Sequence, residues 1–497
     1  MCKLGFDNQK YLELQSKHIR ERIAQFGGKL YLEFGGKLFD DYHAARVLPG
    51  FAPDSKLQML LQLKDDAEVV IVINSADIEK NKIRGDLGIT YDLDVMRLID
   101  AFRSVGLYVG SVVLTRYDSQ LSAEQFANKL ESLGVKVYRH YSIPGYPHNI
   151  ESIVSESGYG RNEYIETTRK LVIVTAPGPG SGKLATCLSQ LYHDNLRGIK
   201  AGYAKFETFP IWNIPVNHPV NMAYEAATAD LNDRNMLDHF HMDAYGVVTV
   251  NYNRDLETFP VLKATLEQIY GSSPYKSPTD MGVNMAGNCI IDNDVVSAAA
   301  KQEIIRRYYS ALCEQKENMT TSDTDAVGKL EILMKQAGIT VLDRPVVAAA
   351  NAKAALTGAP AAAIELPDGT ILTGKTSSLL GASAALILNA LKALAGIDDD
   401  AQLISPSIIE PVQHLKVDHL GNHNPRLHID EVLIALAISA VTDEKAAGAL
   451  EQLDNLKDCE VHSSVILSAT DSRTFKKLGI NVTCEPQYQV KKLYHAK

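Results

Sequence analysis

From residue 68 onward, the chain alternates short β-branched runs with segments of helical periodicity. Four apolar runs, at 68–73, 108–114, 135–138 and 170–175, are each long enough for one buried strand. Between them, apolar residues recur at helical spacing, at 91–105 and 122–133. Strands that alternate with helices form a parallel sheet whose faces the helices cover. The pattern therefore predicts an α/β fold whose N-terminal part has a Rossmann-like or P-loop-like parallel sheet.

The rest of the chain predicts two further parts. Helical periodicity at 259–270 and 295–316 indicates a mainly helical subdomain, and the polar stretch 317–325 is the best candidate for a linker. A second α/β region follows, with strands expected at 361–366, 370–373 and 461–467 and a helix at 379–394. At about 150 residues per domain, 497 residues correspond to roughly three domains. We expect their bounds to be 1–250, 251–325 and 326–497.

Composition and charge exclude several classes of partner. The net charge of -10 argues against general affinity for nucleic acid or anionic lipid, because binding to polyanions depends on clustered Lys and Arg. The six cysteines include no CxxC pair, so they indicate neither a zinc knuckle nor a disulfide framework. The first residues lack the apolar core of a signal peptide, and the apolar stretch 379–397 is interrupted by Gly381, Asn389 and Lys392. We therefore expect a cytoplasmic protein outside the membrane.

A glycine-rich turn, Thr175 to Lys183, is the strongest local signal, because it follows a predicted buried strand and precedes a predicted helix. Glycines let backbone N–H groups face an anion, the helix N-terminus adds partial positive charge, and a lysine adds a full charge. The turn resembles the phosphate-binding sequence GxxxxGK[ST], but Pro177 replaces its first glycine and Leu184 the hydroxyl that holds magnesium. A purely structural turn is the alternative. The predicted binding residues are Gly178, Gly180, Ser181, Gly182 and Lys183.

A second segment of similar composition is 369–378, before the helix expected at 379–394. There, exposed amides, hydroxyl groups and a lysine at a helix start could hold a phosphate or a carboxylate. The alternative is an ordinary Ser/Thr-capped helix after a hairpin. The predicted binding residues are Lys375, Thr376 and Ser377.

Two further segments concentrate carboxylates and imidazoles. If residues 230–243 formed one helix, Asp230, Asp233 or Arg234, and His241 would share a face, and the aspartates could move protons or bind magnesium. A solvated helix is the alternative. In the C-terminal region, His414, His419, His423, His428 and His462 could contribute to a metal site with Glu431, or belong to a polar loop, but no spacing matches a known zinc signature.

Four motifs together resemble the bacterial family known as domain of unknown function 1846: APGPGSGK, PDGTILTGKTSSLLGAS, HNPRLHIDEVLIALAISA and CEVHSSVILS. The resemblance runs nearly end to end. It implies an N-terminal Rossmann-like region, a helical middle and a distinct C-terminal α/β subdomain. It implies no activity.

The leading functional hypothesis is an enzyme acting on a nucleotide or phosphorylated metabolite, because such ligands bind at the carboxyl ends of parallel strands. Lys183, Asp230 and Asp233 are the predicted catalytic residues, and phosphoryl transfer would require ATP and Mg²⁺ as cofactors. One alternative is a non-catalytic sensor or assembly protein that binds a small anion. Another is a metal-dependent hydrolase or deaminase at the C-terminal histidines. We expect a homo-oligomer in each case.

Overall fold

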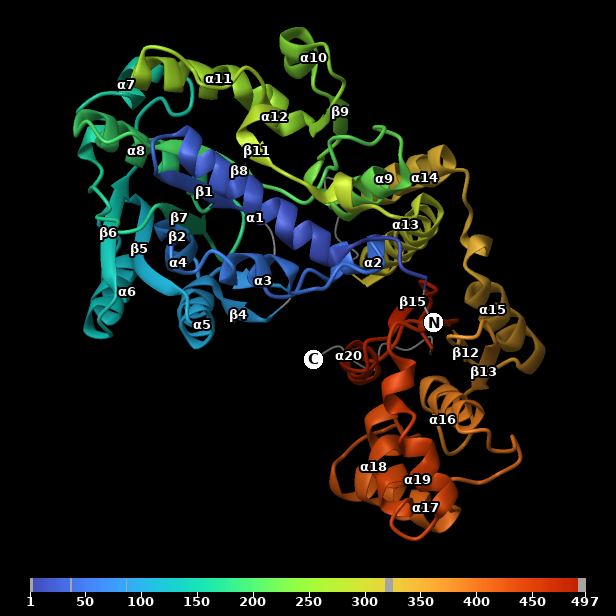
Figure 1. Ribbon diagram of the computed structural model, residues 1–497. Helices are drawn as coiled ribbons and strands as arrows, with labels where there is room; N and C mark the ends of the chain where they lie inside the picture. The colour runs from blue at the N-terminus through green and yellow to red at the C-terminus, as the bar shows by residue number, and fades with distance from the viewer. Residues whose placement is uncertain (1–2, 36–37, 86, 318–324, 490–497) are drawn as a thin grey trace. The chain divides into compact units, whose positions relative to one another are not determined.

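The computed structural model describes residues 3–35, 38–85, 87–317 and 325–489 (Figure 1). The chain divides into two compact units. We call Leu4–Glu225 with Asp233–Ala300 the N-terminal unit, and Ala226–Asn232 with Lys301–Lys497 and the first three residues the C-terminal unit. The three-domain division expected from the sequence stays a prediction.

A seven-stranded parallel sheet forms the centre of the N-terminal unit (Figure 1). Its strands, in spatial order, are β11 (Gly282–Val283), β8 (Gly202–Phe206), β1 (Leu30–Phe34), β7 (Leu171–Thr175), β2 (Ala67–Asn74), β5 (Tyr108–Tyr117) and β6 (Lys136–Tyr141). All eight residues of β2 and all five of β7 are buried. Such continuous apolar burial is typical of parallel strands covered on both faces.

Helices cover this sheet. On one face, α8 packs against β1, β7 and β8, and α11 packs against α8. The helices and short strands of this unit are α1 (Asn8–Gln25), α2 (Tyr42–Val47), α3 (Ser55–Leu61), α4 (Ser75–Glu79), β3 (Ile83–Arg84), β4 (Ile89–Thr90), α5 (Tyr91–Ser104), α6 (Leu121–Ser132), α7 (Ile150–Ile153), α8 (Lys183–Leu196), β9 (Asn235–Leu237), α10 (His239–Tyr245), β10 (Val250–Tyr252), α11 (Asn253–Tyr270) and α12 (Pro278–Met281). Two helices cross the division between the units: α9 (Pro219–Ala227) and α13 (Asn293–Glu317).

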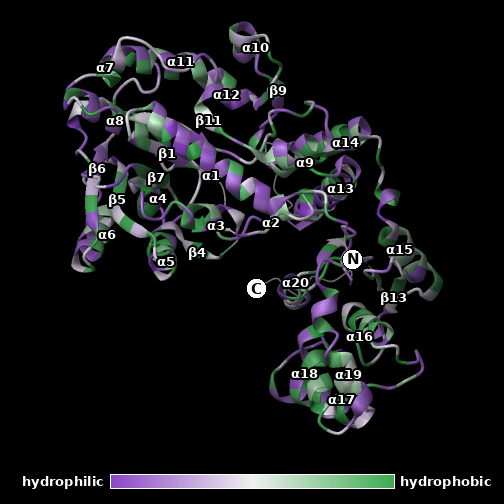
Figure 2. Ribbon diagram, in the orientation of Figure 1, coloured by the Kyte–Doolittle hydropathy of each residue, from purple (hydrophilic) through white to green (hydrophobic). Residues whose placement is uncertain are grey.

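The C-terminal unit has a smaller, mixed sheet. Its order is β13 (Ile371–Lys375), β12 (Ala361–Glu365), β14 (Glu460–Ser463) and β15 (Asn481–Cys484), with only β14 and β15 parallel. Figure 2 shows hydrophobic residues along α18 and α19, whose buried positions join the core of this unit. Its helices are α14 (Ala326–Ala337), α15 (Pro345–Thr357), α16 (Ala382–Leu394), α17 (Pro406–His414), α18 (Ile429–Ser439), α19 (Glu444–Leu450) and α20 (Ala469–Lys477).

The predicted α/β class, with a Rossmann-like sheet and a second sheet region, is confirmed. One local prediction is wrong: residues 230–243 do not form one helix. A 3-10 turn at Ala229–Leu231 ends at Asn232, whose φ of 59° is left-handed, and β9 follows. A separate helix, α10, then begins because the buried Asp238 carboxylate caps it by accepting from the His241 N–H.

A second correction concerns the helix expected at 379–394, which begins at Ala382. The Ser377 hydroxyl accepts from the N–H groups of Leu379 and Leu380, and this turn delays the helix. Most of the expected linker, 318–324, lies outside the described residues.

Candidate functional site

The glycine-rich turn lies at the carboxyl edge of the large sheet, in the middle of the strand order. It follows β7, which has β1 on one side and β2 on the other, and it leads directly into α8. In sheets of this kind, ligands bind beyond the carboxyl ends of the strands, at the point where the strand order reverses. The turn is therefore at the position where such a fold binds its ligand.

Glycine is required at several positions of the turn. Gly180 and Gly182 have φ of 75° and 92°, a region that side chains disfavour. A Cβ on Gly178 would lie 2.3 Å from the Tyr91 hydroxyl oxygen, so a side chain there would collide with the first residue of α5. These constraints hold the backbone in one open curve.

Two side-chain hydrogen bonds hold the backbone of the turn in place. The Thr115 hydroxyl of β5 donates to the Ser181 carbonyl at 2.6 Å, and the Ser181 hydroxyl donates to the Gly178 carbonyl at 2.8 Å. Both bonds use carbonyl groups. The backbone N–H groups of Gly178 and of Gly180 to Ala185 find no acceptor within the described residues. Six consecutive amides, together with that of Gly178, are thus left for an external acceptor.

Electrostatics at the start of α8 favours an anion. This helix has no side-chain cap and no acidic residue in its first turn. In the described parts of the chain, Lys183 forms neither an ion pair nor a hydrogen bond. An uncapped helix N-terminus with a free lysine is an arrangement that binds phosphate or carboxylate groups.

A strained residue adjoins the turn. Arg116 has a φ of 49° and lies in a bulge of β5, where the register shifts between Leu114 and Tyr117. Bulges and strained backbone often direct a side chain at a functional site. The guanidinium is exposed and follows Thr115, the residue bonded to the turn.

A carboxylate, Glu33, lies at the end of β1, the strand that pairs with β7. Burial raises the pKa of the Cys187 thiol, with Glu33 adding to the rise and Lys183 opposing it, so both charges act beside the first turns of α8. Glu33 lies next to the last residue of β1, is half-buried, and accepts from the Tyr203 hydroxyl at 2.7 Å. Its register partner in β8 is Lys205.

Lys205 is the centre of a buried charge cluster. Its ammonium binds Glu207 at 2.7 Å and also the Asp255 carboxylate, and the Tyr252 hydroxyl donates to Glu207 at 2.7 Å. Burial alone lowers the pKa of Lys205, but these carboxylates and Glu33 raise it overall. Burial raises the pKa of Glu207, and Lys205 offsets only part of this rise. Groups with perturbed pKa values in one cluster are typical of functional sites.

The other predicted residues lie elsewhere. Asp233 is in the N-terminal unit, where its carboxylate binds the Arg254 guanidinium, whereas Asp230 belongs to the C-terminal unit. In the C-terminal unit, Lys375 is exposed at the end of β13, Ser377 is used in its own turn, and Thr376 lines a cavity described below. Asp230, Asp233 and these three residues stay predictions.

The C-terminal histidines are spread over several local pairs. His414 lies 2.9 Å from Asp418, and His428 lies 3.0 Å from Asp471. Within the residues that the structure describes, no three His, Cys, Asp or Glu side chains gather in a way that could hold a metal ion. Nor is any helix of those residues long and apolar enough to cross a membrane.

Sequence reasoning missed Glu33, Lys205, Glu207, Asp255 and Arg116. β1 and β8 pair in parallel although more than a hundred residues separate them in the sequence, and no local motif predicts this pairing. The GYAKF segment of β8 is short and buried at four of its five positions, so it offers no alternation to recognise.

The fold and this edge of the sheet define a mixed α/β protein with a Rossmann-like domain and a second sheet domain. The chain belongs to the DUF1846 family: "Domain of unknown function DUF1846, N-terminal" matches residues 4–338, and its C-terminal counterpart matches 342–494. The resemblance seen in the motifs is thus confirmed.

Curated bacterial relatives are similar over their whole length. The UPF0371 protein cu0538 of Corynebacterium urealyticum is 59% identical over 492 residues, covering 99% of both chains. A UPF0371 protein of Streptococcus thermophilus is 59% identical over 494 residues, covering 99% of this chain and 100% of its own. One from Streptococcus sanguinis is 57% identical, with the same coverage. These names assign no activity.

Proposed function

We propose that the N-terminal unit is an enzyme domain that binds a nucleotide or phosphorylated metabolite at the turn between β7 and α8. The observation that carries the proposal is the set of amides from Gly178 and Gly180 to Ala185 that have no acceptor within the described residues. Amides that converge at a helix N-terminus bind phosphate oxygens. The cytoplasmic location, the homo-oligomeric state and the lack of nucleic-acid partners expected from the sequence are part of this proposal.

In this proposal, the side chains around the turn have different chemical functions. Lys183 and Arg116 balance the charge of the phosphate oxygens, because Lys183 begins α8 and Arg116 follows Thr115, which bonds to the turn. Glu33 accepts or releases a proton, and the Tyr203 hydroxyl of β8 positions its carboxylate. Asp230 and Asp233, which the sequence predicted as catalytic residues, do not belong to this group of side chains, and Asp233 pairs with Arg254.

Phosphoryl transfer with ATP and Mg²⁺ is the reaction class that this arrangement favours. Leu184 stands where a hydroxyl would hold the metal ion, so another group at the sheet edge would have to replace it. The lack of a hydroxyl at Leu184 also favours the second candidate function, a non-catalytic sensor of a phosphorylated compound. The enzyme and the sensor both bind the phosphorylated compound, but only the enzyme converts it.

A thermal-shift screen tests the shared claim. Nucleotides, nucleotide sugars, sugar phosphates and inorganic phosphate are added to the full chain with and without Mg²⁺, and the screen is repeated on Lys183→Ala. A ligand at 100 times its dissociation constant stabilises the fold by about 2.7 kcal/mol. We expect at least one phosphate compound to raise Tm in the wild type and to lose this effect in the variant.

The matched control is Lys129→Ala. Lys129 is an exposed lysine in the last turn of α6, near the amino edge of the sheet, so the shift should be unchanged. A shift that survives Lys183→Ala, or no shift from any phosphate compound, contradicts the proposal. Turnover that disappears in Glu33→Gln while the shift remains distinguishes the enzyme from the sensor.

A further inference from the structure

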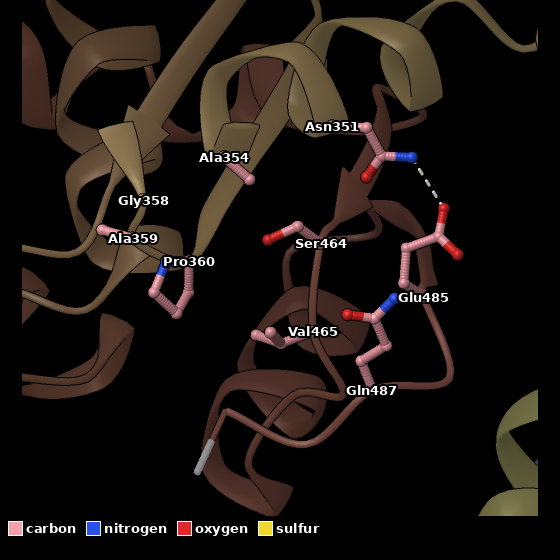
Figure 3. A pocket seen from close by; sticks show the side chains of 9 residues that line it. All are labelled: Asn351, Ala354, Gly358, Ala359, Pro360, Ser464, Val465, Glu485 and Gln487. Carbon is pink, nitrogen blue, oxygen red and sulfur yellow. Dashed lines mark hydrogen bonds between the residues drawn. The ribbon is translucent and has the colours of Figure 1, made fainter. Parts of the chain in front are cut away.

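The C-terminal unit contains a small-molecule-sized cavity that the proposed function does not use. It has a volume of about 490 Å³ and lies between α15, the turn before β12, and the ends of β14 and β15 (Figure 3). Ligand sites for small molecules have volumes of about 300–1,000 Å³. A second cavity of about 50 Å³ adjoins it, because Pro360 and Val465 line both.

The smaller cavity has hydrogen-bond donors without partners. The N-terminus of the 13-residue helix α16 opens into it, with Gly381 at the cap position and no side-chain cap. Ser383 lines the cavity, is only 4% exposed, and has no hydrogen-bond partner in the described chain. Thr376 also lines it, and its hydroxyl is buried without a partner. Buried hydroxyl groups are normally paired, so these two lack an acceptor that a ligand could supply.

An arginine and a histidine line the same cavity. The Arg426 Nε donates to the Ser377 carbonyl at 2.7 Å, which fixes the guanidinium while its other two nitrogens have no acceptor among the described residues. His428 Nδ1 lies 3.0 Å from Asp471, whose hydrogen bond raises the pKa of this imidazole. The Asp471 carboxylate is already engaged, because it also accepts from the Ile429 N–H and the Ser468 hydroxyl. The cavity therefore favours an anion.

The larger cavity presents the opposite charge. Glu485 lines it, and one carboxylate oxygen, Oε1, accepts from Asn351 at 2.8 Å and from Tyr309 at 3.3 Å (Figure 3 shows the first bond). His462 Nε2 lies 3.3 Å from the same oxygen, and these contacts lower the pKa of Glu485. The second oxygen, Oε2, has no partner within the described residues. An ionised carboxylate with one free oxygen accepts from an ammonium or hydroxyl group.

We propose that the C-terminal unit binds a small amino-bearing anion, with its carboxylate or phosphate held by α16, Ser383, Arg426 and His428 and its ammonium facing Glu485. The smaller cavity, of about 50 Å³, has room for one such anionic group, since about 10–15 Å³ on this measure holds one water. The larger cavity holds the rest of the molecule. This site is independent of the turn at Lys183, which belongs to the other unit.

Titration calorimetry on the full chain tests this site with two matched pairs of probes. O-phosphoethanolamine and ethyl phosphate share a phosphate, but only the first has an amine. β-Alanine and propionate are the equivalent carboxylates. We expect the amine-bearing member of one pair to bind about tenfold more tightly or better, because a charge-assisted hydrogen bond contributes that much. The pair that binds identifies the anion.

Variants then locate the binding. Arg426→Gln and Ser383→Ala should each weaken binding of the preferred probe, by about tenfold for the charged residue. Glu485→Gln should remove the preference for the amine. Lys445→Ala is the control, because this lysine of α19 is exposed and lines neither cavity, and Lys183→Ala separates this site from the proposed function. Both controls should bind as the wild type does.

The proposal is overturned if none of the four probes binds at millimolar concentration, or if Arg426→Gln and Ser383→Ala both bind like the wild type. Equal affinity for the two members of each pair would overturn the assignment of Glu485. Loss of binding in Lys183→Ala would place the probe at the turn instead. Ser383→Ala removes one hydroxyl only, so it tests the site even if Arg426→Gln fails to fold.

Discussion

At the residue scale, Gly182 shows how tightly the turn is built. Its φ is 92°, and an added Cβ would lie 3.0 Å from the Thr115 hydroxyl oxygen. Gly180 has a similar φ of 75°, but nothing lies within 4 Å of its added Cβ. Both glycines therefore have a strained backbone, but only Gly182 also lies close to β5. Comparing the two positions distinguishes the effect of strain from that of close contact.

We predict that Gly182→Ala destabilises the protein more than Gly180→Ala does. The shared strain costs about 1–2 kcal/mol in each variant, and only Gly182→Ala must also displace Thr115. Urea unfolding of both variants measures the difference. Equal losses of stability would mean that the contact between the turn and Thr115 is not as close as described.

A second residue-scale prediction concerns His140 in β6. Burial lowers the pKa of His140 to about 4, and its Nε2 lies 3.1 Å from the Glu163 carbonyl. Because the folded pKa lies below the ordinary value, the stability from neutral His140 is present above pH 6.5 and is lost as the pH falls toward 4. The loss is about 3 kcal/mol.

The measurement for His140 is the free energy of unfolding at several pH values between 6.5 and 4. We expect His140→Gln, which keeps an N–H for Glu163, to lose less stability over this range than the wild type. Parallel curves for the two proteins would show that His140 titrates as it does in the unfolded chain.

At the element scale, Arg344 connects strands of the small sheet. It precedes α15, is completely buried, and donates to the Val461 and Asn481 carbonyls, both at 3.0 Å. Its guanidinium also binds Glu460, which Arg306 of α13 binds at 2.7 Å. Although burial raises the pKa of Glu460, the two arginines lower it overall. One side chain thus satisfies buried acceptors on β14 and β15.

We predict that Arg344→Leu costs about 3–5 kcal/mol of stability, because it leaves buried acceptors without a donor. The comparison is Lys136→Ala, which breaks an exposed ion pair with Glu166 and should change stability little. Chemical denaturation measures both. A small effect of Arg344→Leu would contradict the connecting function of this residue.

The elements predictable from sequence were those with strong apolar patterns. The runs at β2, β5 and β7 are long and β-branched, and they were recognised. β8 and β15 were missed because they are short and carry polar residues, so their burial depends on the neighbouring strands. The turn before α8 was recognised from its local sequence, as β7 was. Glu33 and Arg116 were not recognised, because only the pairing of strands in the fold brings them near the turn.

The C-terminal site was even less accessible to sequence reasoning. Of the three residues predicted there, Thr376 lines the smaller cavity and Lys375 and Ser377 do not, and their predicted binding function stays a prediction. Arg426, His428 and Asp471 reach it from segments separated by up to about fifty residues, and Glu485 reaches the adjoining cavity from another strand end. Only the fold brings these charges together.

At the scale of the whole molecule, anion binding is local in an acidic protein. The net charge is -10, so positive potential is confined to places such as the turn at Lys183 and the cavity at Arg426. We therefore predict no measurable binding of duplex DNA at physiological salt, checked by fluorescence anisotropy. Micromolar binding that weakens steeply with salt would contradict this prediction.

Amide hydrogen exchange with and without a phosphate compound tests the central claim most directly. The probes are ADP with Mg²⁺ and inorganic phosphate, added to the wild type and to Lys183→Ala. If the turn binds phosphate, exchange slows in peptides covering Gly178 to Ala185, whose amides have no acceptor among the described residues, and the variant loses this protection. Unchanged exchange in these peptides, with protection appearing elsewhere or nowhere, would contradict the account.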